Sequence, residues 1–96
     1  MLEIVAEVTL FGASRGGLRK AVKNGLRPSF RYAGELVACE IWAEQVDVWV
    51  PLDQSFRARI KLPYGDELGW KFVGGEPFGL NIASHVIGEG VVLAPG

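Results

Sequence analysis

The side chains that could carry acid–base or metal chemistry are few, and no motif groups them. His85 is the only histidine. One imidazole without further cues defines neither a Ser-His-Asp triad nor a metal site, which usually needs several nitrogen or sulfur ligands. Glu40 and Glu44 would share one face of a strand and could pair as acid and base, but eleven acidic residues produce such pairs by chance. We therefore expect no catalytic residue, no metal and no cofactor, and a surface or strand-end position for His85.

The single cysteine points to packing rather than to reactivity. Cys39 is the only cysteine, so no intramolecular disulfide can form, which fits a reducing cytoplasm. It stands two residues from Val37 and from Ile41, on the apolar side of a predicted strand. We expect a small buried hydrophobic residue and not a nucleophile. The chain also lacks the Gly-x-x-x-x-Gly-Lys-[Ser/Thr] loop that cradles phosphates, so no nucleotide is expected.

Positive charge is concentrated in one part of the chain. Residues 12–33 hold six of the ten Lys and Arg residues and no acidic residue, although the net charge of the whole chain is −1. The six are Arg15, Arg19, Lys20, Lys23, Arg27 and Arg31. Two interpretations are open: a solvated basic loop, or a patch that binds an anion or an acidic partner. The net charge itself gives no field that would attract nucleic acid or membrane.

Other features also allow a structural and a functional interpretation. The glycines of residues 12–17 suit a flexible turn, or an anion-binding nest of backbone N–H groups. Arg57, Arg59 and Lys61 line one side of a strand, as a solvated outer face or edge protection does, although such a row could also follow a phosphate backbone. Trp42 and Trp49 lie opposite the cleaner apolar faces of their strands. If exposed, they mark a protein interface; alternatively, a small barrel packs them under a loop.

The elements that position these residues are short strands separated by turns. Alternation of apolar and polar residues predicts strands over 2–11, 29–32, 35–43, 46–52, 56–62, 70–72, 78–82 and 85–93. Residues 18–23 have helical spacing, but they are too few for a stable helix. Turns rich in Gly and Pro recur about every ten residues, which is typical of an all-β sandwich or barrel. The 96 residues correspond to one domain, 1–96.

Six segments follow one another along the chain in a recognisable order. They are Val5-Ala6-Glu7-Val8, Gly16-Gly17, Gly25-Leu26-Arg27-Pro28-Ser29-Phe30, Val-Pro-Leu-Asp within 46–53, Gly69-Trp70-Lys71-Phe72 and Val86-Ile87-Gly88-Glu89-Gly90-Val91-Val92. In this order and spacing they resemble the C-terminal β-barrel (the third domain) of the elongation factor Tu family. The resemblance covers nearly the whole chain. It implies a small closed six-stranded antiparallel Greek-key barrel, similar to a translation-factor domain, and it argues against a helix at 18–23.

The resemblance also implies a possible RNA partner, because the family's barrel helps to hold the acceptor arm and the T-stem backbone of tRNA. Several contact positions differ here. Leu18 stands where the family has a basic residue after Gly-Gly, Ile82-Ala83 replaces a Glu-Gly pair, and His85 replaces an arginine; Ser29 keeps a polar side chain. Phosphate binding needs hydrogen-bond donors and positive charge at these points. We therefore expect tRNA binding to be weakened, unless nearby cations rebuild a basic surface.

Together these features predict a cytoplasmic, non-enzymatic binding module whose partner is a protein. One specific version is an antagonist or immunity-type mimic of a translation factor; the alternative is a weak RNA-binding domain that uses residues 15–31. The candidate interaction residues are Arg15, Arg19, Lys20, Lys23, Arg27, Trp42 and Trp49. The N-terminal residues do not resemble a signal peptide, and no run of eighteen apolar residues predicts a membrane span.

Overall fold

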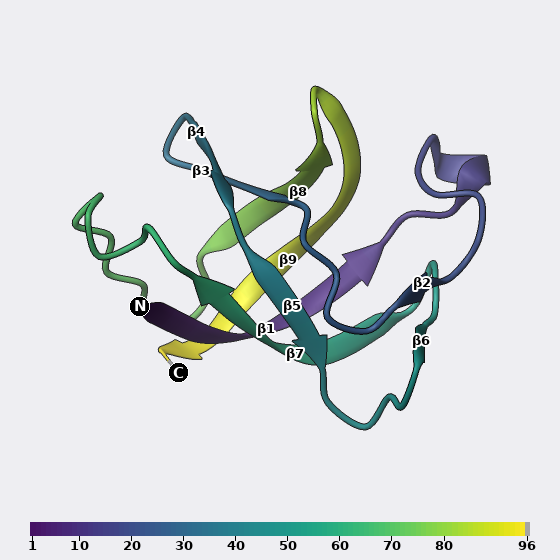
Figure 1. Ribbon diagram of the computed structural model, residues 1–96, viewed down its shortest axis with the longest axis horizontal. Coiled ribbons are helices and arrows are strands. Elements are labelled where there is room, and N and C mark those ends of the chain that lie inside the picture. Colours follow the sequence, from purple (N-terminus) through teal and green to yellow (C-terminus); the bar gives the residue numbers. More distant parts are fainter. Residues whose placement is uncertain (96) are drawn as a thin grey trace.

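The computed structural model describes residues 1–95, which form antiparallel strands around one core (Figure 1). Seven strands form a sheet in the order β4-β3-β8-β9-β1-β7-β5, and β2 and β6 form a separate two-stranded ribbon. The strands are β1 (Leu2–Leu10), β2 (Val22–Lys23), β3 (Ser29–Tyr32), β4 (Glu35–Ala38), β5 (Glu40–Ala43), β6 (Trp49–Val50), β7 (Ser55–Leu62), β8 (Pro77–Ile82) and β9 (His85–Pro95). One short 3₁₀ turn, η1 (Ala13–Arg15), follows β1. The expected all-β antiparallel fold is confirmed.

The centre of the sheet comes from the two segments with the clearest alternation. On β1, Ile4, Ala6 and Val8 are completely buried, and the facing residues of β7 are buried as well. The register places Ile4 opposite Ile60 and Ala6 opposite Ala58. Burial of each large aliphatic side chain contributes about 1.5–3 kcal/mol. Period-2 alternation therefore fixes both which face of these strands is buried and their pairing register.

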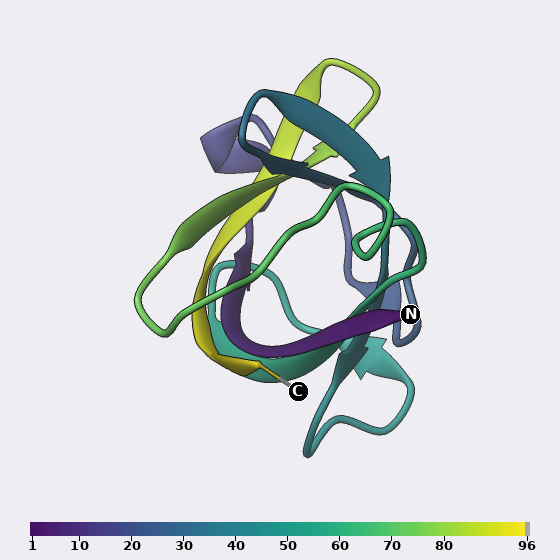
Figure 2. The ribbon, with the colours of Figure 1, turned by 90° about the vertical axis from the view of Figure 1, so that its left-hand side faces the viewer.

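The sheet is a curled half-barrel, and this corrects the expectation of a closed six-stranded barrel. Residues 35–43, predicted as one strand, divide at Cys39 into β4 and β5. β4 pairs with β3 and β5 pairs with β7, so this one run of chain supplies both edges of the sheet. At the division, the backbone N–H and the thiol of Cys39 both donate to the Pro28 carbonyl, at 3.4 and 3.3 Å. Figure 2 shows the strands curling around the core.

Residues 18–23 form no helix, as expected, and only Val22–Lys23 is a strand. Two other element predictions need correction. The strand predicted over 46–52 is reduced to β6, because only Trp49 and Val50 find a partner strand. Residues 70–72 are not a strand. Their aromatic side chains pack inward instead. The Trp70 N–H donates to the Gly65 carbonyl at 3.2 Å, but no strand of residues 1–95 pairs with this segment.

An aromatic cluster fills one end of the core. The ring of Phe30, on β3, stacks on Phe78 at 4.5 Å between centroids and meets the edge of Phe72 at 5.9 Å. Trp70 packs edge-on against Tyr32 at 5.1 Å. Such pairs stabilise by about 0.5–1.5 kcal/mol beyond their buried area. The Arg27–Phe30 stretch therefore places the central ring of this cluster in the core.

No helix among residues 1–95 is long and apolar enough to cross a membrane.

Candidate interaction surface

The side chain of Asn24 holds the two-stranded ribbon in place. Its Oδ1 accepts a hydrogen bond from the backbone N–H of Ala43 at 2.7 Å, and its Nδ2 donates to the carbonyls of Ala43 and Val46 at 3.0 and 3.2 Å. The Asn24 backbone N–H donates to the Val48 carbonyl at 2.8 Å. The connection from β5 to β6 is therefore fastened at several points to Asn24, which directly follows β2. These hydrogen bonds limit the motion of the backbone of this connection.

The ribbon presents a tryptophan to solvent. Lys23 pairs directly with Trp49, and Val22 pairs with Val50. Because side chains alternate across a strand, the two pairs point to opposite faces. Val50 is completely buried, whereas 59% of Trp49 is exposed, with Val48 exposed beside it. We call Lys23, Val48 and Trp49 the ribbon surface. Trp49 thus points outward and is not packed under a loop.

Trp42 is half-exposed but is held by its neighbours. It is 45% exposed, and its indole N–H donates to Glu40 Oε1 at 2.6 Å. Its ring lies over Gly25, where an added Cβ would be 2.8 Å from the ring and where φ is +85°. The hydrogen bond from Trp42, with smaller contributions from Arg27 and Lys61, lowers the pKa of Glu40. Trp42 therefore packs on the outer face of the sheet, and Gly25 makes room for it.

Three of the six predicted cations are engaged within the chain. Arg15 lies 4.1 Å above the Phe11 ring and 3.8 Å from the Asp53 carboxylate. Arg27 pairs with Glu40 at 3.0 Å. Arg31 donates to Asn81 Oδ1 at 2.9 Å. Exposed pairs of this kind contribute about 0–1 kcal/mol each, but they reduce the positive charge that these residues offer to a partner.

The other three cations have no such partner. Arg19, Lys20 and Lys23 are exposed, and no ion pair or side-chain hydrogen bond involves them within residues 1–95. Lys23 lies beside Trp49 across the ribbon. Contacts join some of the seven predicted interaction residues. Lys23 and Trp49 come together, Arg27 and Trp42 share Glu40, and Arg15 belongs to a separate loop.

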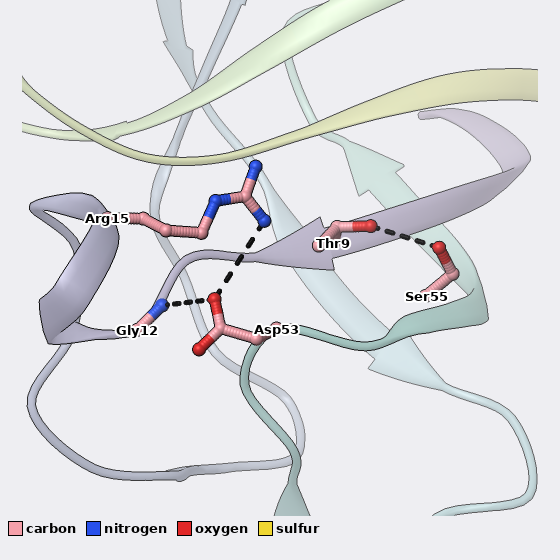
Figure 3. A network of polar contacts seen from close by, with 5 residues as sticks. All are labelled: Thr9, Gly12, Arg15, Asp53 and Ser55. Carbon is pink, nitrogen blue, oxygen red and sulfur yellow. Dashed lines mark hydrogen bonds and ion pairs between the residues drawn. The ribbon is translucent and has the colours of Figure 1, made fainter.

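The glycine-rich turn binds the carboxylate of Asp53, an acidic residue of the same chain (Figure 3). The backbone N–H of Gly12 donates to Asp53 Oδ1 at 2.9 Å, and Arg15 faces the same oxygen. A Cβ at Gly12 would collide with this carboxylate. Nearby, the hydroxyls of Thr9 and Ser55 lie 3.1 Å apart. Asp53 is therefore a structural residue of this turn. The sequence does not indicate this role, because Asp53 is far from Gly12 along the chain.

The cationic row on β7 lies between acidic residues. Arg59 pairs with Glu3 of β1 at 3.1 Å, and Arg57 lies 3.7 Å from Glu44, just beyond β5. In register, Lys61 faces Glu40. Because β7 is flanked by strands on both sides, this row is not edge protection. Its charges are balanced on a solvated outer face, and this arrangement does not favour the phosphate-tracking interpretation.

The residues considered for chemistry are dispersed. Burial raises the pKa of the Cys39 thiol to about 12, which leaves it protonated and inert at neutral pH. His85 is exposed at the start of β9. No three His, Cys, Asp or Glu side chains of residues 1–95 are grouped as they would be to hold a metal ion. Among the described residues, the ribbon surface combines an exposed aromatic side chain with an unpaired cation.

Comparison with known proteins adds no family to these observations. No protein-family model matches the chain, and a search of curated proteins finds no match either. The function is therefore inferred from the surface of the molecule.

Proposed function

We propose that the protein is a non-enzymatic binding module and that its partner is another protein. The observation that carries this proposal is the exposure of Trp49 on a ribbon fastened by Asn24. Tryptophan is enriched among the residues that dominate binding energy at interfaces. A backbone segment that is fastened before binding also loses less conformational freedom when the complex forms. Lys23 would give the same surface a preference for an acidic neighbour.

We further propose that the curled sheet is related to the third domain of elongation factor Tu. The module would then be an antagonist or immunity-type mimic in the cytoplasm, occupying a partner that normally grips the translation factor. Two glycines of the Val86–Val92 segment support the relationship. A Cβ at Gly88 would lie 2.7 Å from the Thr9 carbonyl oxygen, and one at Gly90 would collide with the Phe78 ring. Both positions need glycine because β9 lies so close to its neighbours, so this motif has a structural reason.

The protein-partner proposal is tested by affinity capture on nuclease-treated extract, followed by binding measurements with the purified partner. Trp49→Ala is expected to weaken binding by about tenfold or more, since loss of a dominant interface residue costs about 1.4 kcal/mol or more. Tyr64→Ala is the matched control, because Tyr64 is also an exposed aromatic, at 53%. Equal binding by wild type and Trp49→Ala would contradict the proposal.

RNA binding is the second candidate, and the unpaired state of Arg19, Lys20 and Lys23 favours it. Replacing all three by Ala should abolish tRNA binding at low salt. For wild type, the logarithm of the affinity should fall with a slope of about −2 to −3 against the logarithm of the salt concentration, for roughly three phosphate contacts. A matched control replaces Arg57, Arg59 and Lys61 by Ala, which removes the same charge from the balanced row. An equal loss in both triple variants, or no binding by wild type, argues against this candidate.

A further inference from the structure

An apolar cleft lies between residues 18–28 and the hairpin formed by β8 and β9. Its volume is about 150 Å³, and Arg27 is its only charged lining residue. The other lining residues are Leu18, Val22, Leu26, Pro28, Ile82 and Ile87. Ile82 is 53% exposed at the end of β8, although it is a large aliphatic side chain.

The walls of the cleft are held by backbone hydrogen bonds. The Leu18 N–H donates to the Phe11 carbonyl at 2.7 Å, and the Ile41 N–H donates to the Leu26 carbonyl at 2.9 Å. Ile87 is buried in the sheet. The fold therefore holds the walls of the cleft in place, and Ile82 forms its exposed apolar wall.

Positive charge predominates around the cleft. No acidic residue lines it, and residues 12–33 contain none. The lining residue Arg27 is paired with Glu40. Arg19 and Lys20 follow the lining residue Leu18 in the chain, and neither has an ion pair among the described residues. A carboxylate placed here would be attracted by these two cations.

We propose that this cleft binds an acidic peptide segment of a partner protein, which inserts one phenylalanine side chain between aspartates and glutamates. Apolar cavities of about 150 Å³ accept a ring the size of benzene, and the neighbouring cations would attract the flanking carboxylates. The inference rests on the proposed protein-binding function and adds the chemistry of the bound segment. It is a second site, because Val22 lies on the face of β2 opposite to Lys23 and Trp49.

The lining favours a peptide anchor over a nucleobase. Proteins hold unpaired bases mainly by stacking them on aromatic side chains, and no aromatic residue lines this cleft. Aliphatic walls with a proline suit a side chain that is bound by burial of apolar area.

The test is an NMR titration of the methyl-labelled full chain with the blocked peptide Asp-Glu-Phe-Glu-Asp at low salt. We expect saturable shifts at the methyl groups of Leu18, Ile82 and Ile87. Replacing Phe by Ala in the peptide should weaken binding about tenfold or more, since the ring supplies the buried area. Raising the salt from about 50 to 200 mM should weaken binding further through screening of the carboxylates.

Variants separate the cleft from the general charge of the surface. Ile82→Asp should abolish the saturable shifts, and Ile82→Ala should weaken binding without adding a charge. Leu36→Asp is the matched control, because Leu36 is 50% exposed and does not line the cleft. The amide spectrum of each variant shows whether the fold is retained.

Several results would overturn the proposal. These are the absence of saturable shifts at peptide concentrations up to about 5 mM, equal affinity for the Phe and Ala peptides, or stronger shifts of the same methyls with a uridine oligonucleotide. Shifts confined to the Val48 methyl groups would also overturn it, while leaving the ribbon surface as a protein-binding site. Conversely, the peptide could bind in the cleft while the Trp49→Ala variant binds the partner protein as tightly as wild type does. This result would reject the ribbon surface as the protein-binding site and would support the cleft as the peptide site.

Discussion

At the scale of single residues, the hydrogen bond between Tyr32 and Glu76 ties a loop to the aromatic cluster. The Tyr32 hydroxyl donates to Glu76 Oε1 at 2.6 Å, and the Val73 N–H donates to Oε2 at 2.8 Å. The first bond lowers the pKa of Glu76 most, and the second lowers it further. The same bond to Glu76, then burial, raises the pKa of Tyr32. One carboxylate therefore fastens residues 73–76 to β3.

This bond makes stability depend on pH in a defined window. Because the pKa of Glu76 is lowered on folding, its contribution is present above the ordinary value of 4.5 and is lost as pH falls through the folded value. The raised pKa of Tyr32 makes its contribution present below 10.0 and lost as pH rises beyond that. Urea unfolding should therefore show a deficit for Glu76→Gln that is largest between about pH 5 and 10 and disappears in acid. Glu67→Gln, at an exposed carboxylate, is the control; a deficit independent of pH would contradict the assignment.

Asn24 fastens the connection between β5 and β6, and its loss should be costly. Asn24→Ala removes the side-chain partners of the Ala43 N–H and of the Ala43 and Val46 carbonyls. Loss of hydrogen bonds from partly buried groups typically costs about 1–3 kcal/mol of unfolding free energy. Urea unfolding measures this loss, with Gln54→Ala as the control at an exposed amide. In this variant, hydrogen exchange should become faster at the backbone N–H of residue 24, which donates to the Val48 carbonyl. An unchanged exchange rate there would show that the Asn24 side chain does not hold the ribbon.

At the scale of elements, the β3–β4 hairpin contains a turn residue that does not suit its backbone. Ala33 and Gly34 have φ of +52° and +78°, as the two central residues of a type I′ turn do. The left-handed region costs an L-residue with a Cβ about 1–2 kcal/mol, whereas Asn tolerates it. Ala33→Asn should therefore stabilise the protein by roughly 0.5–1 kcal/mol. Thermal or urea unfolding tests this, with Ala21→Asn as a control outside the left-handed region; no gain specific to position 33 would refute it.

At the scale of the whole molecule, the curled sheet protects its only thiol. Cys39 stands between β4 and β5, where one run of chain supplies both edges of the sheet, and it is buried. Reaction of this thiol therefore requires the sheet to open. We expect a disulfide reagent to modify Cys39 at a rate that follows the population of the globally unfolded state, rising with urea as unfolding does. Rapid modification under native conditions would mean that the sheet opens locally at Cys39.

Sequence patterns were most informative where the deciding contacts are local. The alternation over 2–11 and 56–62 predicted β1 and β7, because period-2 spacing reflects which face of a strand is buried. The spacing around Cys39 predicted its burial in the same way, and Gly and Pro marked the turns. The patterns failed at 46–52 and 70–72 because a strand also needs a neighbouring strand to pair with. Within these two segments, only Trp49 and Val50 pair with another strand.

What the sequence determined by itself is therefore an antiparallel all-β chain with a basic segment between residues 12 and 33. Only the tertiary structure decided which of those cations have partners and which tryptophan is the more exposed. Arg15 is matched by Asp53 and Arg27 by Glu40, while Trp49 is left outside. The physical reason is that charge pairing and exposure depend on which distant segments the sheet brings together. Alternation within one strand does not specify those neighbours.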